Sequence, residues 1–232
     1  MTPTPTQPIC EVIILTALPV EYQVVLHYLE ELQEVVHPSG TIYHHGQFRA
    51  VPQTWLVAVA QISLGGPSAA LETERAIQFF GASIALFVGV AGGLKNARLG
   101  DVIAATKIHA YEYGKDGTTF EPRPEQWKAS YALLQRAQAE ARTDAWLACI
   151  DNPGPDAAPR VFVGPLAAGE KVVASTRSDV AQRLREMLAI LWHRLNRLDE
   201  TLHVAVSEAH NPLERVLPRN MSFVLESFHW FL

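Results

Sequence analysis

The stretch Phe87–Asp101, FVGVAGGLKNARLGD, indicates how the rest of the chain is organised. It begins at the end of a short apolar run of β type, and this run leads into Gly89, Gly92 and Gly93. Residues without a Cβ let the backbone approach a ligand closely, and they also tolerate a positive φ. A second apolar run, Val102–Thr106, follows directly. Strand, glycine-rich floor, turn and strand together predict a small-molecule site on an α/β sheet.

The composition excludes several classes of protein. With 48% hydrophobic and 19% charged residues, the 232-residue chain is typical of a globular protein with one substantial core. Its net charge of −5 argues against nucleic acid or an anionic membrane surface as a partner. No apolar segment approaches the roughly 20 residues that span a bilayer, and the start lacks the features of a signal peptide. Cys10 and Cys149 show no CxxC spacing, so we expect no disulfide framework. Because neither a signal-peptide pattern nor a membrane-spanning run is found, we expect a cytoplasmic location.

Apolar runs and helical patterns alternate along the chain. Runs rich in β-branched residues predict strands, which we expect at Glu11–Thr16, Thr41–Arg49, Thr54–Ala60, Ser83–Gly89, Val102–Ala110 and Arg160–Gly164. Periodicity predicts a helix from Pro19 to Leu32 and another over Ser68–Phe80. This alternation predicts a three-layer α/β/α sandwich with a central mixed sheet. Ligands in such folds bind at the carboxyl ends of strands, where three glycine-rich turns lie in this sequence.

The second half of the chain holds more residues that interrupt regular structure. We expect a loop over Lys115–Pro124, followed by a helix that carries Trp127 and Tyr131 on one face. A turn of small residues is expected over Leu166–Gly169. A stripe of apolar residues at helical spacing predicts a last long helix over residues 180–198.

Two features could take part in chemistry. Glu21 would lie one turn into the first helix, where the helix dipole favours a carboxylate that could act as an acid or base. The alternative is a solvated surface glutamate. The turn Gly65-Gly66-Pro67-Ser68 could present N–H groups and a hydroxyl to an anion or a sugar, or it could be simple turn geometry. The histidines, His109 among them, show no metal-ligand spacing, so we expect no metal site, and we expect most of them to lie at the surface or to be hydrogen-bonded in the core.

Five ordered motifs combine into a resemblance. They are Thr16-Ala17-Leu18 followed by Glu21, Leu64–Ser68 (LGGPS), Gly89–Leu94 (GVAGGL), Leu99–Val102 (LGDV) and Gly164–Glu170 (GPLAAGE). Their order resembles the purine and uridine phosphorylase superfamily, which includes the methylthioadenosine/S-adenosylhomocysteine nucleosidases. The resemblance covers residues 11–180. It implies cleavage of the N-glycosidic bond of a purine nucleoside or nucleotide, by water or by phosphate, without a cofactor.

The resemblance also implies which residues surround the ribose. Glu21 falls where the nucleosidases keep the glutamate that positions the attacking water. Ser63 or Ser68, together with Gly65 and Gly66, falls in the turn that holds the nucleophile and the ribose.

The expected base pocket follows from the same resemblance. Ala91, Gly92 and Gly93 fall on the floor beneath base and ribose. Val172 and Val173 fall at the edge of the base pocket, where the family usually has an aromatic residue.

Two motifs of the family are absent. The family places V-E-M-E-G, whose second Glu binds the ribose hydroxyls, and then R-G-I-S-D, whose Asp protonates the purine, and neither occurs after Ser175. An out-of-frame translation from about Glu186, or a truncation, would explain this absence. A real helical replacement is the alternative, supported by the apolar stripe over residues 180–198. We favour the first, and we expect C-terminal strands to be lost or replaced by helix and activity to be low or absent.

These observations predict a disordered arm over residues 1–10, a nucleosidase-like domain over 11–180 and a divergent tail over 181–232. Hydrolysis is favoured over phosphorolysis because Thr16–Val25 contains no arginine for a phosphate. The alternatives are a non-catalytic nucleoside-binding sensor or effector of the same fold, a phosphorolytic enzyme, and an unrelated α/β binding domain. The expected partner is a small-molecule nucleoside or nucleotide. The resemblance implies a homodimer or a higher homo-oligomer.

Overall fold

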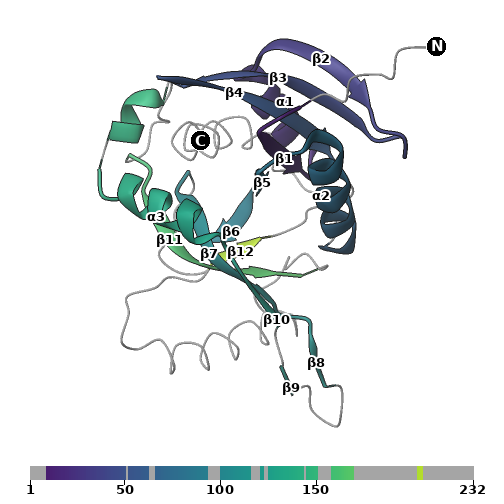
Figure 1. Ribbon diagram of the computed structural model, residues 1–232. Helices are drawn as coiled ribbons and strands as arrows, with labels where there is room; N and C mark the ends of the chain where they lie inside the picture. Colours follow the sequence, from purple (N-terminus) through teal and green to yellow (C-terminus); the bar gives the residue numbers. More distant parts are fainter. Residues whose placement is uncertain are drawn as a thin grey trace, which may run out of the picture. The chain divides into compact units, whose positions relative to one another are not determined.

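The fold consists of two compact units, one ending at Gly89 and the other beginning at Val90 (Figure 1). The computed structural model describes residues 9–50, 52–62, 66–93, 100–115, 121–122, 125–143, 145–150, 158–169 and 203–205. Each unit contains its own five-stranded sheet of mixed parallel and antiparallel strands. Mixed sheets were expected from the sequence. The single central sheet was not found, because the described strands hydrogen-bond in two five-stranded sheets and a separate two-stranded ribbon.

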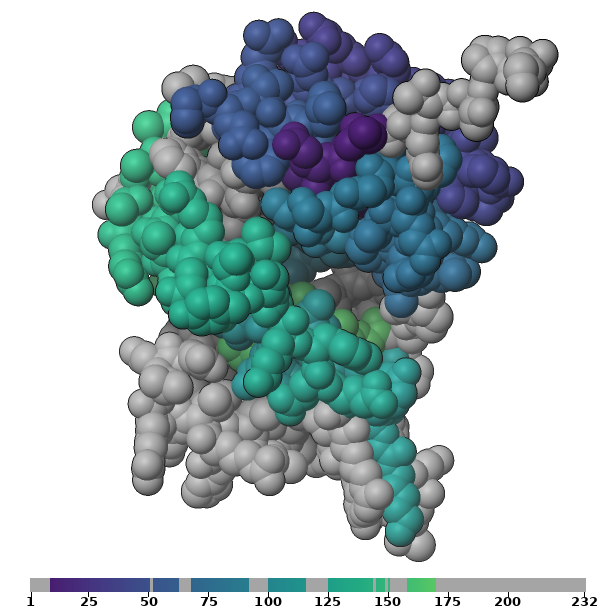
Figure 2. Space-filling view, in the orientation of Figure 1, coloured from purple at the N-terminus to yellow at the C-terminus, as the bar shows by residue number. Residues whose placement is uncertain are grey.

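The first unit is built on a sheet with the strand order β2-β3-β4-β1-β5. Its elements are β1 (Val12–Thr16), α1 (Pro19–His27), β2 (Glu30–Val36), β3 (Ile42–Ala50), β4 (Gln53–Gln61), α2 (Gly66–Phe80) and β5 (Ile84–Phe87). The central strand β1 is parallel to both neighbours, β4 and β5. The strands β2 and β3 extend the sheet as an antiparallel hairpin. Figure 2 shows this unit as a continuous surface coloured from purple to blue.

A helix covers each face of this first sheet. On one face, α2 packs Ala76 and Phe80 into a core with Tyr43 of β3, and the rings of Tyr43 and Phe80 have centroids 5.0 Å apart. Successive side chains of a strand point to opposite faces, so His44 faces the other side. There the Tyr22 hydroxyl of α1 shares a hydrogen bond with His44 Nδ1. The first unit therefore has helix, sheet and helix in three layers.

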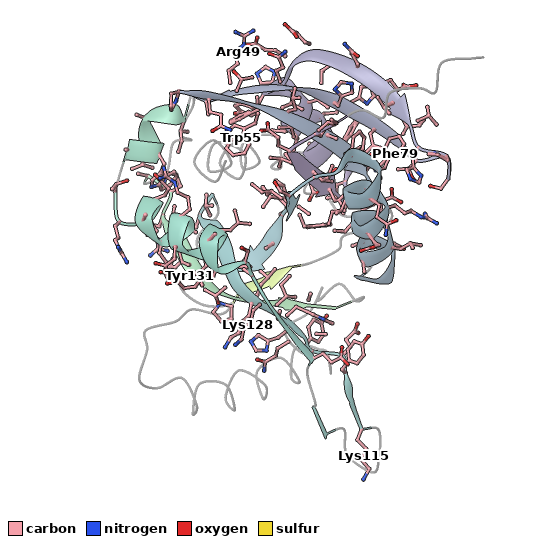
Figure 3. All side chains as sticks on the ribbon, viewed as in Figure 1. Arg49, Trp55, Phe79, Lys115, Lys128 and Tyr131 are labelled. Atoms are coloured by element: carbon pink, nitrogen blue, oxygen red, sulfur yellow. The ribbon has the colours of Figure 1, made fainter. Side chains whose placement is uncertain are left out.

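The segment Glu30–Val36 is a strand, although helical periodicity predicted that the first helix would extend to Leu32. The helix α1 ends at His27, and β2 then pairs with β3. Cross-strand pairing determines that this segment is a strand. Val35 lies opposite Tyr43, is partly buried and packs against the core. At the β2–β3 turn, His37 contacts Phe79 of α2, with ring centroids 4.8 Å apart. Figure 3 labels Phe79 on this helix.

An irregularity in β2 leads to a prediction about stability. Among the described residues, Glu31 is the one non-glycine residue with a positive φ, 55°, and it lies where the β2–β3 register shifts. Because a Cβ is strained in the left-handed region, Glu31→Gly is expected to raise the free energy of unfolding by about 1 kcal/mol. Urea unfolding followed by circular dichroism measures this. Glu31→Ala keeps the Cβ and should bring no gain. Glu34→Gly, at a position without positive φ, should be destabilising, and a gain there would contradict the explanation.

The second unit contains a sheet with the strand order β10-β7-β11-β12-β6. Its elements are β6 (Ala91–Gly93), β7 (Val102–Ala110), β8 (Gly114–Lys115), β9 (Glu121–Pro122), β10 (Glu125–Lys128), α3 (Tyr131–Glu140), a 3₁₀ helix (Ala145–Cys149), β11 (Val161–Ala168) and β12 (His203–Ala205). The strands β7, β11 and β12 are parallel, and β10 and β6 are antiparallel edge strands. Val102, Trp146 and Ile150 form a core cluster of this unit.

Several elements of the second unit correct the expectations from sequence. The helix expected to carry Trp127 and Tyr131 is instead β10 followed by α3, and these two side chains are 50% and 77% exposed. The antiparallel pairing of β10 with β7 outweighs the local helical pattern. Within the expected loop Lys115–Pro124, the short strands β8 and β9 form a two-stranded ribbon, and Lys115 lies on this ribbon (Figure 3).

Two further expectations concerned later segments. The expected turn Leu166–Gly169 overlaps β11, which continues to Ala168 because it pairs with β7 up to Ala110. The short strand β12 lies between β11 and β6 in the sheet. The expectation that C-terminal strands are lost or replaced by helix otherwise falls on residues 170–202 and 206–232, which lie outside the described residues. The helix expected over residues 180–198 lies outside the described residues. No helix in the described part of the chain is both long and apolar enough to cross a membrane.

Candidate functional site at the carboxyl edge of the first sheet

Three parallel strands of the first unit end at the same edge of the sheet. The ladder continues beyond the strand ends, because the Ile62 N–H donates to Thr16 O at 2.9 Å and the Val88 N–H donates to Leu15 O at 3.0 Å. The turns that follow β4 and β5 therefore leave from the edge where α1 also begins. This is the edge at which the sequence predicted the glycine-rich turns, of which residues 63–65, after β4, lie outside the described residues. The third turn was expected after the strand Arg160–Gly164, but its residues up to Ala168 belong to β11 in the sheet of the second unit.

Glu21 lies at this edge, in the first turn of α1. Its side chain is 3% exposed, so it is not the solvated surface glutamate that was the alternative. Its Oε2 accepts hydrogen bonds from the backbone N–H groups of Ala17 and Leu18, at 2.9 and 2.8 Å. These N–H groups precede the helix and have no partner within it, and the helix dipole also favours a negative charge here. The sequence around the end of β1 thus holds a buried carboxylate in one position.

Gly89 lies against the Glu21 carboxylate. A Cβ at residue 89 would be 2.9 Å from Glu21 Oε1 and 3.2 Å from its Cδ. The two residues belong to the same unit and meet at the carboxyl ends of β1 and β5. The sequence predicted close approach of a ligand to this glycine, whereas the group that approaches it here is the side chain of Glu21. A glycine directly after a strand was the signal, but its partner could not be read from the sequence.

The structure places the other predicted residues as follows. Gly66 begins α2, and Ser68 lies in its first turn with an exposed side chain. Ala91, Gly92 and Gly93 form β6 in the second unit and pair with Ala205, Val204 and His203 of β12. Ser63, Gly65, Val172 and Val173 lie outside the described residues.

Asp101, in the L-G-D-V motif, has a structural role in the second unit. Its carboxylate accepts hydrogen bonds from the backbone N–H of Arg160 at 2.9 Å and from the Arg160 guanidinium at 2.7 Å. The Val102 N–H in turn donates to Arg160 O. The preceding Gly100 has a φ of 89°, a conformation that favours glycine. This motif therefore joins the beginnings of β7 and β11.

His109 of β7 is a buried histidine whose ring makes no hydrogen bond. In the sheet, His109 lies opposite Gln126 of β10 on one side and Ala167 of β11 on the other. Its side chain is fully buried. Neither ring nitrogen has a hydrogen-bond partner in the structure. Burial, with a smaller contribution from Lys107, lowers the pKa of His109 below its usual value. His109 is thus an exception to the expectation that most histidines lie at the surface or are hydrogen-bonded in the core.

The pKa of His109 predicts an acid-sensitive second unit. In the unfolded chain a histidine takes up a proton as the pH falls through about 6.5, whereas folded His109 stays neutral to lower pH. Protonation thus favours the unfolded state, and stability is expected to fall as the pH drops below about 6.5. Urea unfolding between pH 7.5 and 5 measures this, and His109→Leu should show a shallower decline than the wild type. His27→Gln, which changes an exposed histidine, should keep the wild-type decline. Equal slopes for wild type and His109→Leu would contradict this prediction.

Other reactive side chains do not form a second centre in the described residues. Burial, followed by the charge of Glu11, raises the pKa of Cys10 to about 12, so this free thiol stays protonated at neutral pH. Within the described ranges, no group of three or more His, Cys, Asp and Glu side chains is arranged to hold a metal ion. The carboxyl edge with Glu21 is therefore the candidate site.

Comparisons with known proteins agree with this fold. In solved structures, the chain is similar to a 5'-methylthioadenosine/S-adenosylhomocysteine nucleosidase from Neisseria meningitidis, with a TM-score of 0.61, 19% identity, and coverage of 94% of this chain and 95% of the other. It is similar to such a nucleosidase from Colwellia psychrerythraea, with a TM-score of 0.63, 16% identity, and coverage of 95% and 92%. A futalosine hydrolase mutant of Helicobacter pylori gives a TM-score of 0.60, 16% identity, and coverage of 95% and 96%.

These likenesses, at under 25% identity, concern the fold. Among curated protein sequences, none matches this chain significantly. The family model described as the phosphorylase superfamily matches residues 11–197, which is most of the chain. The chain therefore belongs to the phosphorylase superfamily.

Proposed function

We propose that this chain binds a purine nucleoside or nucleotide at the carboxyl edge of the first sheet, and that it hydrolyses the N-glycosidic bond slowly or not at all. One observation carries the proposal: the buried carboxylate of Glu21, held by two backbone N–H groups where parallel strands end. Ligands of α/β sheets bind at this edge. A carboxylate fixed in this way can accept a hydrogen bond from a ribose hydroxyl or orient a water molecule.

The nature of the ligand is inferred from the relatives. The Neisseria meningitidis nucleosidase was solved with methylthio-immucillin-A, and the Colwellia psychrerythraea nucleosidase with adenine. Membership of the phosphorylase superfamily supports a nucleoside ligand for this chain as well. Gly66 and Ser68 at the start of α2, which belongs to the same unit as Glu21, are proposed as further ligand-binding residues.

Low activity is inferred from the sequence. After Ser175 the chain has neither V-E-M-E-G nor R-G-I-S-D, the motifs that supply the ribose-binding glutamate and the acid that protonates the purine. Without an acid, the departing base leaves as an anion, and general acid catalysis typically contributes about 10²–10⁴-fold to the rate. We therefore propose that the chain acts as a nucleoside-binding module with little or no turnover. Association with a second copy of the chain stays a prediction, for which sedimentation velocity is the measurement.

Isothermal titration with 5'-methylthioadenosine and with adenine tests the proposal. We expect both to bind, and we expect Glu21→Gln to weaken nucleoside binding about tenfold or more, because a hydrogen bond to a charged group contributes about 1.5–3 kcal/mol. Glu11→Gln is the matched control: the Glu11 carboxylate also accepts a backbone N–H, from Leu56 at 3.0 Å, but at the amino end of β1. This control should bind like the wild type.

A purine-release assay on the same protein completes the test. Little or no adenine should be released from 5'-methylthioadenosine. Release at an ordinary enzyme rate would refute the proposed loss of activity, and an absence of binding to both compounds would refute the proposed ligand class.

A further inference from the structure

Gly89 and Glu21 are far apart in the sequence and meet at the carboxyl edge of the first sheet. We infer that Gly89 is a positioning residue: the absence of a side chain at this position leaves room for the Glu21 carboxylate, so residue 89 determines where that carboxylate lies relative to a bound nucleoside. The identity of the ligand rests on the proposed function. The contact between Gly89 and Glu21 rests on the geometry of the first unit alone.

The geometry concerns all three atoms of the carboxylate. A Cβ on residue 89 would lie 2.9 Å from Oε1, 3.2 Å from Cδ and 3.3 Å from Oε2 of Glu21. Non-bonded carbon atoms attract each other best at about 3.5–4.0 Å, so even a methyl group here is too close and something must shift. No other residue contributes to this set of nearest atoms. The space that a side chain would need at residue 89 is thus occupied by Glu21.

The carboxylate has little freedom to move away. Its Oε2 is held by the N–H groups of Ala17 and Leu18, at 2.9 and 2.8 Å, and the side chain is 3% exposed. Withdrawal from residue 89 would lengthen or break these bonds and leave partly buried N–H groups unpaired. A side chain at residue 89 therefore competes directly with the two hydrogen bonds that fix Glu21.

Backbone conformation does not explain the glycine at this position. Among the described glycines, Gly40, Gly81 and Gly100 have a positive φ, and Gly89 does not. An alanine could adopt the backbone of residue 89 without strain in φ, so the requirement for glycine comes from the Glu21 contact. This separates Gly89 from glycines that are needed for a turn.

A double-mutant cycle on the whole chain tests the inference. Gly89→Ala is expected to weaken binding of 5'-methylthioadenosine about tenfold, while adenine, which lacks the ribose, should bind within about twofold of the wild type. In the Glu21→Ala background, Gly89→Ala should cause no further loss of nucleoside affinity, because the group that it displaces is absent.

Gly81→Ala is the matched control. This glycine follows α2, has a φ of 66°, and has no atom within 4 Å of the position a Cβ would take. Alanine there should lower the melting temperature through backbone strain while leaving nucleoside affinity unchanged. The control separates a general loss of stability from displacement of the carboxylate.

Two results would overturn the inference. One is an equal loss of nucleoside affinity from Gly89→Ala with and without Glu21; the other is unchanged affinity in the wild-type background. If the wild-type chain binds neither compound, the proposed function fails, and melting temperatures then decide the inference. Gly89→Ala should lower the melting temperature by about 3–6 °C in the wild type and by much less with Glu21→Ala, and equal losses would refute the contact.

Discussion

Replacing Gly46 by valine is expected to lower the free energy of unfolding of the first unit by about 3 kcal/mol, the largest effect that we predict for a single residue. Gly46 lies in β3, and a Cβ there would be 2.7 Å from the backbone carbonyl oxygen of Glu30 and 3.1 Å from Leu32 Cδ2. The carbonyl belongs to β2, so the added side chain would push apart a pair of hydrogen-bonded strands. A backbone atom cannot rotate away as a side chain can.

Urea unfolding of the wild type, Gly46→Ala and Gly46→Val measures this effect. The loss should increase from alanine to valine as the added volume grows. The double variant Gly46→Ala with Leu32→Ala is the control, because it removes the neighbouring side chain and leaves the Glu30 carbonyl in place. It should regain little stability. Recovery to the stability of Leu32→Ala alone would show that side-chain crowding, and not the backbone contact, is responsible.

Replacing Glu72 by alanine is expected to destabilise the same unit by about 2–3 kcal/mol. Tyr43 is fully buried, and its hydroxyl donates to Glu72 Oε1 of α2, while Arg75 lies 3.5 Å from Oε2. Burial, together with this hydrogen bond and the charge of Glu72, raises the pKa of Tyr43, so the phenol remains a donor at any ordinary pH. Without Glu72, that donor is left buried and unpaired, and an unpaired buried group costs more than the net gain from its hydrogen bond.

The double variant with Tyr43→Phe identifies the cause. Tyr43→Phe alone should cost about 1 kcal/mol, the usual net contribution of one hydrogen bond. Combined with Glu72→Ala, it should restore part of the stability lost in Glu72→Ala, because no unpaired hydroxyl then remains. Strictly additive losses in urea unfolding would show that the Tyr43–Glu72 bond does not link β3 to α2 as described.

Local patterns were sufficient for much of the first unit. The apolar, β-branched run at Val12–Thr16 and the run within Gln53–Gln61 became the buried strands β1 and β4. The periodic segment after Gly66 became α2. The position of Glu21 also followed from local signals, because Pro19 opens the helix directly after β1 and places the glutamate in its first turn. Each of these features depends on neighbours within a few residues, which a sequence displays directly.

Other features depended on partners that are distant in the sequence. Glu30–Val36 and Glu125–Lys128 show weak strand patterns and became strands by pairing with β3 and β7. His109 lies on a strand that was predicted from the sequence. That its ring nitrogens have no hydrogen-bond partner depends on the neighbours that bury it. A pattern of residue types does not record which groups will be near in space, and burial and pairing depend on that proximity.

The sequence by itself determined the class of fold, the carboxylate at the end of the first strand, and the family, because apolar periodicity, Pro19 and the ordered glycine motifs are local and specific. Only the tertiary structure decided that most strands divide into two five-stranded sheets, and that Gly89, the first glycine after Phe87, lies against Glu21. The physical reason is that hydrogen-bonded pairing and close packing are made between segments far apart along the chain, and these contacts exist only once the chain has folded.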